Sequence, residues 1–458
     1  MNTPPLSGGI EGPAALRPLL TTVLDALYDG AVARSGPLPA GGPWHTAARV
    51  RAAVHPVLPP TGTGAEEALR TLVTAVTEGA ADPADPHCAA HLHCPPLALA
   101  TAADLAASAL NPSMDSWDQA PAASEIETLV TAALAAEVYP QHPAADALIT
   151  TGGTESNQVA LLLARELHGP VQVVCGANAH HSLHRAAWLL GLPEPVAVPA
   201  PTGTMDLAAL DAALTDLHPQ LLVVATAGTT DTGQIDPIPD IADLCDTHGA
   251  ELHIDAAYGG PLLFSPTHRP KLTGIDRAHS VTLDLHKLGW QPAAAGIVAV
   301  ADPARLHPLG HTADYLNADD DTEAGLPDLL GRSLRTTRRP DILKIAVTLR
   351  ALGRDGLADL VDRTCARATE LAQLTEQHPE FELYEHPTIS TVLLRPTTAD
   401  DETLATLRRT LLTEGRAVLG RARTPDGRLW LKATLLNPHT TTGDLTTLLK
   451  LLEGSTPR

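Results

Sequence analysis

The segment Leu252-His-Ile-Asp-Ala-Ala-Tyr-Gly-Gly260 decides the fold, because it joins a short apolar run to a carboxylate and a pair of glycines. Such a run, bounded by glycine, is typical of a buried strand. Asp255 stands at the carboxyl end of that strand, where open α/β sheets bind their ligands. A buried carboxylate is costly unless a cation faces it, although an Asp that caps the next helix gives the same pattern. The segment therefore predicts a sheet strand that ends in either a functional or a capping Asp.

Runs of the same kind recur on both sides of this strand, with helix-like segments between several of them. They are Ala147–Thr150, Val171–Val174, Leu221–Ala225, Ser280–Leu283 and Gly296–Val300. Strands that alternate with helices are typical of a mostly parallel sheet covered on both faces. The last run follows its neighbour after only a short turn, so it could instead pair antiparallel. The predicted fold class of this region is α/β.

The regions before and after these strands have different patterns. Apolar residues at helical spacing predict helices over Pro13–Tyr28 and Gly64–Gly79. A long helical stretch, Pro340–Gln377, is followed by strand candidates at Ile389–Leu394 and Leu429–Thr434. These changes predict three parts: a helical N-terminal segment over residues 1–85, a large α/β domain over 86–338, and a small α+β C-terminal domain over 339–458.

The charge balance excludes two classes of partner. The chain of 458 residues has 31 Lys and Arg against 53 Asp and Glu, which gives a net charge of −22. Binding to nucleic acid or to an anionic membrane surface requires clustered basic residues, so both are disfavoured. A disordered acidic protein is disfavoured too, because 44% of the residues are hydrophobic and no long acidic run occurs.

The five cysteines are scattered, and no two of them form a C-x-x-C pair. This usage is typical of a reducing compartment. The N-terminus does not resemble a secretory leader, and no apolar window is long enough to span a membrane, so we expect a cytoplasmic location. No metal site is expected, because the grouped histidines His180, His181 and His184 lack a carboxylate or cysteine partner.

Thr150-Thr-Gly-Gly-Thr-Glu-Ser-Asn157 follows one predicted strand and opens a helix. Backbone N–H groups at such a helix N-terminus favour an anion, and phosphate suits them best. A glycine-rich turn with a helix cap is also structurally ordinary. The segment matches neither the dinucleotide-binding pattern G-x-G-x-x-G nor the P-loop pattern, so both of those sites are disfavoured.

Asp284-Leu-His-Lys287 ends the next predicted strand. A lysine in this apolar context is suited to imine formation, although a lysine in a surface loop is the alternative. Taken together, a phosphate-binding turn, an Asp at one strand end and a Lys at the next are what pyridoxal phosphate requires. The turn anchors the phosphate, the Asp keeps the pyridine nitrogen protonated, and the Lys holds the aldehyde as a Schiff base.

At these motifs the chain resembles the group II amino acid decarboxylases, which are pyridoxal phosphate enzymes of fold type I. The resemblance begins near His87, continues to the C-terminus, and includes Asn178-Ala-His-His-Ser182 and Arg335–Lys344. It implies a mostly parallel seven-stranded sheet flanked by helices, and a homodimer whose N-terminal helices wrap the partner. It also implies a set of site residues: Lys287 as the Schiff-base lysine, Asp255 beside the pyridine nitrogen, His180 stacked on the ring, Ala257 under the ring, and Gly153, Thr154, Ser156, Thr229 and His286 near the cofactor.

The polar segment Gly310–Gly325 is too charged for a core and is typical of a lid over an active site. In the family that the chain resembles, a Tyr on this loop protonates the substrate carbon after carbon dioxide leaves, and Tyr315 falls at that place. The resemblance therefore implies that Tyr315 is catalytic and that the reaction is simple decarboxylation, since relatives with Phe there tend toward oxidative chemistry. A solvent-facing loop Tyr is the alternative.

Residues 91–119 should form one wall of the pocket, and they are most similar to the branch that acts on lysine and related diamino acids. The candidate substrate-binding residues are His91, His93, Trp117 and Asp118. Either Asp115 or Asp118 could pair with a distal ammonium. Helix capping by these Asp residues and simple packing of the two His residues are the alternatives.

The predicted function is decarboxylation of a cationic diamino acid (lysine, ornithine or 2,4-diaminobutyrate) to an amine, in siderophore or other specialised metabolism. One alternative is a decarboxylase of glutamate, aspartate, or an aromatic or aliphatic amino acid. Others are a diverted pyridoxal phosphate reaction, such as oxidative deamination or carbon–carbon bond formation, and a non-catalytic scaffold. The wall segment shows no Arg or Lys that suggests a receptor for a second substrate carboxylate, which disfavours acidic substrates.

Overall fold

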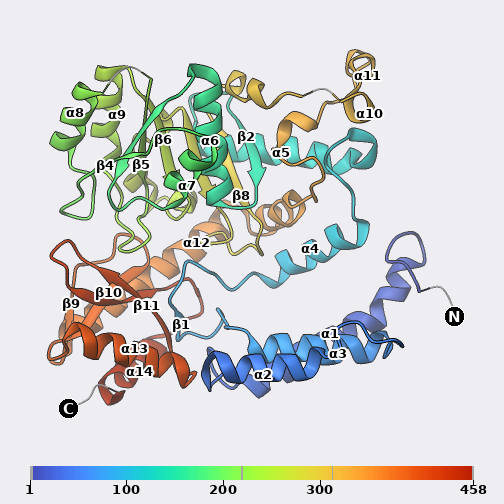
Figure 1. The fold of residues 1–458 in the computed structure, drawn as a ribbon, viewed down its shortest axis with the longest axis vertical. Coiled ribbons are helices and arrows are strands. Elements are labelled where there is room, and N and C mark those ends of the chain that lie inside the picture. The colour runs from blue at the N-terminus through green and yellow to red at the C-terminus, as the bar shows by residue number, and fades with distance from the viewer. Residues whose placement is uncertain (1–3, 218–219, 312, 456–458) are drawn as a thin grey trace.

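A seven-stranded sheet forms the centre of the molecule, which we describe from a computed structural model over residues 4–217, 220–311 and 313–455 (Figure 1). The strand order is β2-β8-β7-β6-β5-β3-β4. The strands are β2 (Asp146–Thr150), β3 (Gln172–Gly176), β4 (Val196–Val198), β5 (Leu221–Thr226), β6 (Glu251–Ala256), β7 (Ser280–Asp284) and β8 (Gly296–Val300).

The pairing confirms a mostly parallel sheet. Strands β4, β3, β5, β6 and β7 pair in parallel, whereas β8 is antiparallel to both β7 and β2, as its short connection allows. The edge strand β4 was not predicted. Its three residues lie between Pro195 and Pro199, and prolines so close together are typical of a loop.

Helices cover both faces of this sheet. On one face lie α6 (Gly153–His168) and α7 (Ser182–Leu189), and on the other lie α5 (Pro121–Val138), α8 (Leu207–Asp216) and α9 (Ile238–His248). Side chains alternate between the two layers, so Leu222 and Val224 pack toward α7 while Val223 packs toward α8 and α9. In the part of the chain that the structure describes, no helix is long and apolar enough to cross a membrane.

The N-terminal helices form an arm that extends along one side of the molecule (Figure 1). Its helices are α1 (Gly12–Arg34), α2 (Gly42–Val54) and α3 (Ala65–Gly79), and α4 (Ala98–Leu110) follows them. Helices α1 and α3 were predicted, and they approach so closely that a Cβ at Gly30 would lie 2.6 Å from Thr77 Cβ. Helix α2 was missed, because its sequence, Gly-Pro-Trp-His-Thr-Ala-Ala-Arg-Val-Arg-Ala-Ala-Val, has few large apolar residues at helical spacing.

The C-terminal part combines α12 (Ile342–Gln377), which is kinked at Gly353, with a five-stranded sheet. The sheet order is β1-β11-β12-β10-β9, and its strands are β1 (Cys88–Ala89), β9 (Phe381–Leu383), β10 (Thr391–Pro396), β11 (Val418–Arg423) and β12 (Leu429–Thr434). Helices α13 (Asp401–Thr413) and α14 (Thr442–Ser455) pack against it. Strand β1 pairs in parallel with β11, so the chain enters this sheet already at Cys88.

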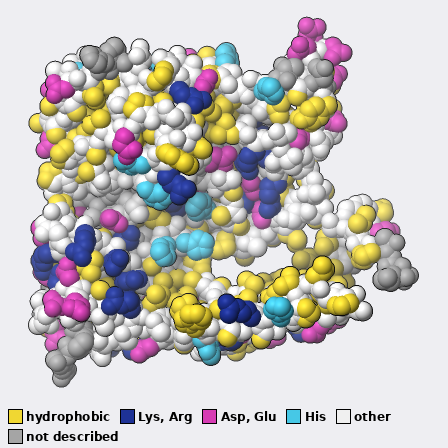
Figure 2. All heavy atoms as spheres, in the orientation of Figure 1, with side chains coloured by type: hydrophobic (Ala, Val, Ile, Leu, Met, Phe, Trp, Pro, Cys, Tyr) yellow, Lys and Arg dark blue, Asp and Glu magenta, His cyan; other side chains and the backbone are white. Residues whose placement is uncertain are grey.

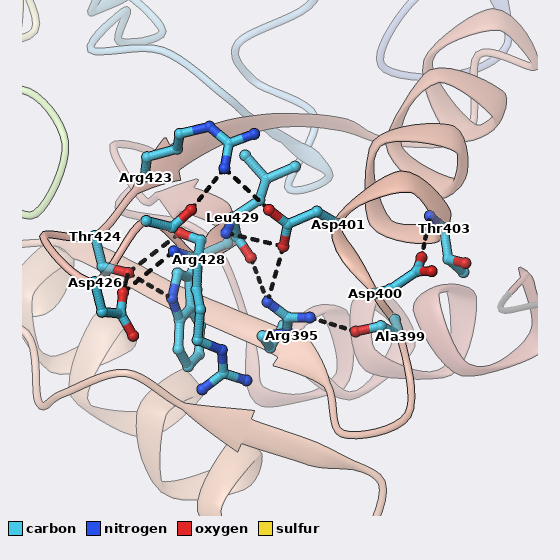
Figure 3. A network of polar contacts seen from close by, with 12 residues as sticks. Arg395, Ala399, Asp400, Asp401, Thr403, Arg423, Thr424, Asp426, Arg428 and Leu429 are labelled. Atoms are coloured by element: carbon cyan, nitrogen blue, oxygen red, sulfur yellow. Dashed lines mark hydrogen bonds and ion pairs between the residues drawn. The ribbon is translucent and has the colours of Figure 1, made fainter.

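Three arginines of the C-terminal part, Arg395, Arg423 and Arg428, take part in a polar network (Figure 3). The buried Arg395 donates to Leu429 O at 2.9 Å and to Asp401 Oδ1 at 3.3 Å. The backbone N–H of Leu429, followed by Arg423, holds the pKa of Asp401 below its usual range. These contacts join β10, β12 and the start of α13, so these arginines serve the fold.

Candidate active site

A cavity of about 310 Å³ lies at the carboxyl ends of strands β2, β5, β6 and β7. This is the edge at which open α/β sheets bind ligands. The predicted site residues that line it are Lys287, Asp255, Ala257, His180, Gly153, Thr154 and His286. Segments from residue 153 to residue 287 therefore meet at one place, as the sequence predicted.

The side chain of Asp255 accepts hydrogen bonds from two N–H donors. Its side chain is 5% exposed, and it accepts hydrogen bonds from Asn157 Nδ2 at 2.8 Å and from the backbone N–H of Ala257 at 3.1 Å. Donors of this kind stabilise the charged form of a carboxylate. A buried anion on the cavity wall is suited to a cationic ring nitrogen.

His180 lies in the same wall and is neutral. Its Nδ1 is 2.8 Å from Ser182 Oγ, and the backbone N–H of Ser182 also points at Nδ1, at 3.3 Å. Burial holds the pKa of His180 below its usual range, although nearby Asp255 opposes the shift. A neutral imidazole is suited to stacking on an aromatic ring.

Lys287 follows β7 on a tightly built turn. It is half-buried, and its charge contributes to the lowered pKa of His180. The turn is fixed by Trp290, which is fully buried and donates from Nε1 to Leu436 O at 2.8 Å. Gly289 is required there, because a Cβ would lie 2.6 Å from Leu285 O. Gly289 and Trp290 thus fix the turn that carries Lys287, and neither residue lines the cavity.

The turn before α6 offers space for a phosphate. A Cβ at Gly153 would lie 2.7 Å from Ala257 Cβ, and one at Gly152 would lie 3.0 Å from His286 Cε1. The glycines therefore keep the N-terminus of α6 open to an anion.

Asp284 is a polar residue of this turn that the sequence reasoning did not assign. It is buried, accepts from the Gly153 N–H at 2.9 Å, and lies 2.6 Å from His286 Nδ1. The sequence did contain a signal for Asp284, because this residue ends a predicted strand and stands three residues before Lys287.

Two predicted cofactor residues do not line the cavity. Ser156 is buried one turn into α6 and pairs with Thr150 Oγ1 at 2.7 Å. Thr229 pairs with Thr232 Oγ1 at 2.8 Å and lines a separate cavity of about 360 Å³. Ser156 thus contacts the phosphate turn through Thr150, and Thr229 stabilises the loop that carries Gly228 and Thr230 of the cavity wall.

None of the four candidate substrate residues lines the cavity. Leu92, which stands between His91 and His93 in the sequence, does line it. Partial burial, followed by His286 and His91, holds the pKa of His93 below its usual range. Trp117 and Asp118 are exposed and do not line the cavity.

Asp115 also lies away from the cavity. It is buried and accepts from Gln119 Nε2 at 2.7 Å. This contact is within a local polar turn, and Asp115 caps no helix, because Ser116 and Ala120 stand at the starts of the two helices that follow.

Tyr315 lies on the outer part of the predicted lid segment. Its side chain is 81% exposed, on α10 (Asp314–Asn317), which is followed by α11 (Asp319–Glu323). Figure 1 shows both helices at the edge of the molecule, and Tyr315 does not line the cavity.

Tyr258 lines the cavity but was not among the predicted site residues. Its hydroxyl contacts Ser390 Oγ at 2.8 Å and Thr391 Oγ1 at 3.0 Å, and burial raises its pKa to about 12. It therefore links the cavity to the start of β10 and works as a neutral hydrogen-bonding group.

Sequence comparison gives an independent result. Residues 65–396 match the family model described as "Pyridoxal-dependent decarboxylase conserved domain". The chain is 42% identical over 402 residues to the L-2,4-diaminobutyrate decarboxylase of Rhizobium meliloti (strain 1021), which covers 84% of this chain and 80% of that protein. It is 32% identical over 427 residues to the enzyme of the same name from Acinetobacter baumannii, covering 85% and 83%.

Solved structures give the same result for the whole fold. The glutamate decarboxylase domain of diaminobutyrate-pyruvate transaminase and L-2,4-diaminobutyrate decarboxylase from Vibrio parahaemolyticus superposes with a TM-score of 0.87 and 32% identity. That match covers 98% of this chain and 97% of the other. Mouse CSAD gives a TM-score of 0.86 at 25% identity, with coverage of 97% and 99%.

Proposed function

The chain belongs to the pyridoxal-dependent decarboxylase family, and on that premise we propose that it decarboxylates a cationic diamino acid, with L-2,4-diaminobutyrate as the first candidate. The single observation that carries the activity is the meeting of Lys287, Asp255 and the Gly152–Gly153 turn in one cavity. The substrate rests on the diaminobutyrate decarboxylases that the chain matches over more than four fifths of its length.

The residues present fit pyridoxal phosphate. The glycine turn and the N-terminus of α6 would hold the phosphate, and Lys287 would hold the aldehyde covalently. Asp255 would keep the pyridine nitrogen protonated, with His180 and Ala257 on the two faces of the ring. When bound, the cofactor supplies an electron sink for the electron pair that remains when carbon dioxide leaves.

The substrate can be identified by testing the enzyme on a panel of amino acids. We expect the purified enzyme to release 1,3-diaminopropane from 2,4-diaminobutyrate, read by mass, in preference to the amines of lysine and ornithine. Glutamate, aspartate and aromatic amino acids should give little product. A preference for glutamate or aspartate would contradict the proposed substrate class, and release of ammonia and peroxide in place of amine would contradict decarboxylation.

We propose that Tyr315 returns the proton to the substrate carbon once the lid segment has closed over the cavity. The Tyr315→Phe enzyme should then form less amine and more of the carbonyl product, because without the proton donor the carbanion reacts with dioxygen. Amine, carbonyl compound and peroxide are measured together. Tyr384→Phe is the control, because that ring packs on Trp430 and does not line the cavity. An unchanged amine yield in Tyr315→Phe would remove this role.

We propose a homodimer in which the α1–α3 arm packs on a second copy of the chain. Large apolar side chains of the arm face solvent in the single chain, among them Leu24, Val32 and Trp44, and Figure 2 shows an opening between the arm and the rest of the molecule. Exposed apolar surface of this kind requires a partner. All five cysteines are free thiols and four of them are buried, which supports a cytoplasmic location.

The dimer gives a direct prediction. Sedimentation should find a particle of twice 47.8 kDa, and the double substitution Leu24→Asp with Val32→Asp should convert it to the monomer. Leu189→Asp, an equally exposed leucine on α7, is the control and should leave the dimer intact. A wild-type monomer at micromolar concentration would contradict the proposal.

A further inference from the structure

Asn157 stands at the centre of a buried hydrogen-bond network beside the cavity. Its amide nitrogen donates to Asp255 Oδ2 at 2.8 Å and to Ser182 Oγ at 2.9 Å. All three side chains are buried. An amide nitrogen has two hydrogens, so both are used, one toward each partner.

The amide oxygen fixes which way the group points. Asn157 Oδ1 accepts from Thr282 Oγ1 at 2.8 Å and lies 3.1 Å from His253 Nε2. Burial lowers the pKa of His253 to about 4, so the ring is neutral. The Ser280 hydroxyl, 2.8 Å from His253 Nδ1, can donate to that nitrogen, which leaves the ring proton on Nε2 to donate to Asn157. The opposite amide orientation would bring Oδ1 against the carboxylate of Asp255, which is unfavourable.

The same network continues to His180. Because Ser182 Oγ accepts from Asn157, its own hydrogen is directed to His180 Nδ1, 2.8 Å away. The backbone N–H of Ser182 points at the same atom. His180 Nδ1 is therefore an acceptor, and the proton of the neutral ring resides on Nε2.

We propose that Asn157 is a positioning residue that sets the charge of Asp255 and the tautomer of His180 together. The amide donates in both directions, so Asp255 stays anionic and His180 presents Nε2–H to a group in the cavity. This inference rests on the roles proposed above for those two residues. It adds that the pyridine nitrogen and the stacking imidazole are controlled by one side chain.

Asn157→Asp tests the branch toward Asp255. The new carboxylate has nearly the same shape, but it supplies at most one hydrogen and would share a proton with Asp255. Two carboxylates in contact raise one pKa of the pair. Since the reaction requires ionised Asp255, the acid limb of kcat should move to higher pH by about one unit. Pyridoxal phosphate titrated into the apoenzyme should bind about tenfold more weakly.

Ser182→Ala tests the other branch alone. It removes the donor to His180 and leaves Asn157 free to donate to Asp255. The acid limb and the cofactor affinity should stay as in the wild type, while kcat falls by up to about tenfold. Asn437→Asp, the same chemical change at a residue that donates to Ala84 O and takes no part in this network, should change none of these quantities.

The inference would be overturned if the acid limb of the kcat–pH profile of Asn157→Asp coincided with that of the wild type. It would also be overturned if Ser182→Ala shifted that limb by the same amount. If Asn157→Asp does not fold, Thr282→Val removes the donor that orients the amide, and a smaller shift in the same direction is expected. An unchanged acid limb in the kcat–pH profile of Thr282→Val would also overturn the inference. The proposed function has a separate test in the loss of cofactor binding by Lys287→Ala, so the two failures are distinguishable.

Discussion

Lys287→Ala should lower kcat for decarboxylation by roughly 10⁴-fold or more, because the amine that holds and releases the cofactor is lost. The visible absorption band of the lysine-bound cofactor should disappear at the same time. Both quantities are read on one preparation after incubation with excess pyridoxal phosphate.

The fold should survive this substitution. Lys287 is half-buried on a turn that Trp290 and Gly289 fix without it, so the thermal unfolding midpoint of the apoenzyme should change little. Lys271→Ala is the matched control, since that lysine donates to Thr388 O and does not line the cavity. Persistence of the visible band in Lys287→Ala would exclude Lys287 as the residue that holds the cofactor.

Asp255→Ala should lower kcat by roughly 100- to 1,000-fold while the enzyme still takes up pyridoxal phosphate on Lys287. Without the anion, the pyridine nitrogen is more easily deprotonated and the ring is a weaker electron sink. Stopped-flow absorbance separates the two effects, because cofactor uptake and substrate turnover are followed independently.

Asp236→Ala controls for the loss of a buried carboxylate. Asp236 accepts backbone N–H bonds from Met205 at 2.8 Å and Thr226 at 2.7 Å, so its removal should lower the thermal unfolding midpoint. If Asp255→Ala and Asp236→Ala lose the same kcat per bound cofactor, the loss reflects stability and the role of Asp255 is wrong.

The strand ends of the site could be predicted because their pattern is local. Asp255 and Lys287 each follow an apolar run directly, and carboxyl ends of parallel strands meet at one edge of a sheet. Ser156 shows where local pattern is insufficient. The motif is contiguous and Gly153, Thr154 and Asn157 line the cavity, but the hydroxyl of Ser156 points to Thr150 Oγ1 instead.

Other parts of the site depend on partners far away in the sequence. Tyr258 contacts Ser390, 132 residues later, and nothing near Tyr258 indicates that contact. Strand β11 was missed for a related reason. Its sequence, Val-Leu-Gly-Arg-Ala-Arg, contains a glycine and two arginines and so lacks the continuous apolar run of the other strands, and the pairing with β1 and β12 forms only in the folded chain.

Strand β1 has a consequence for the order in which the protein is completed during synthesis. Its two residues pair with Val418 and Leu419, although they immediately precede the segment that carries Leu92 of the cavity wall. A ribosome delivers the chain from the N-terminus, so this segment has no pairing partner until nearly the whole protein has emerged. Nascent chains that end before β11 should therefore contain the large sheet, while the segment that carries Leu92 still lacks the strand that places it.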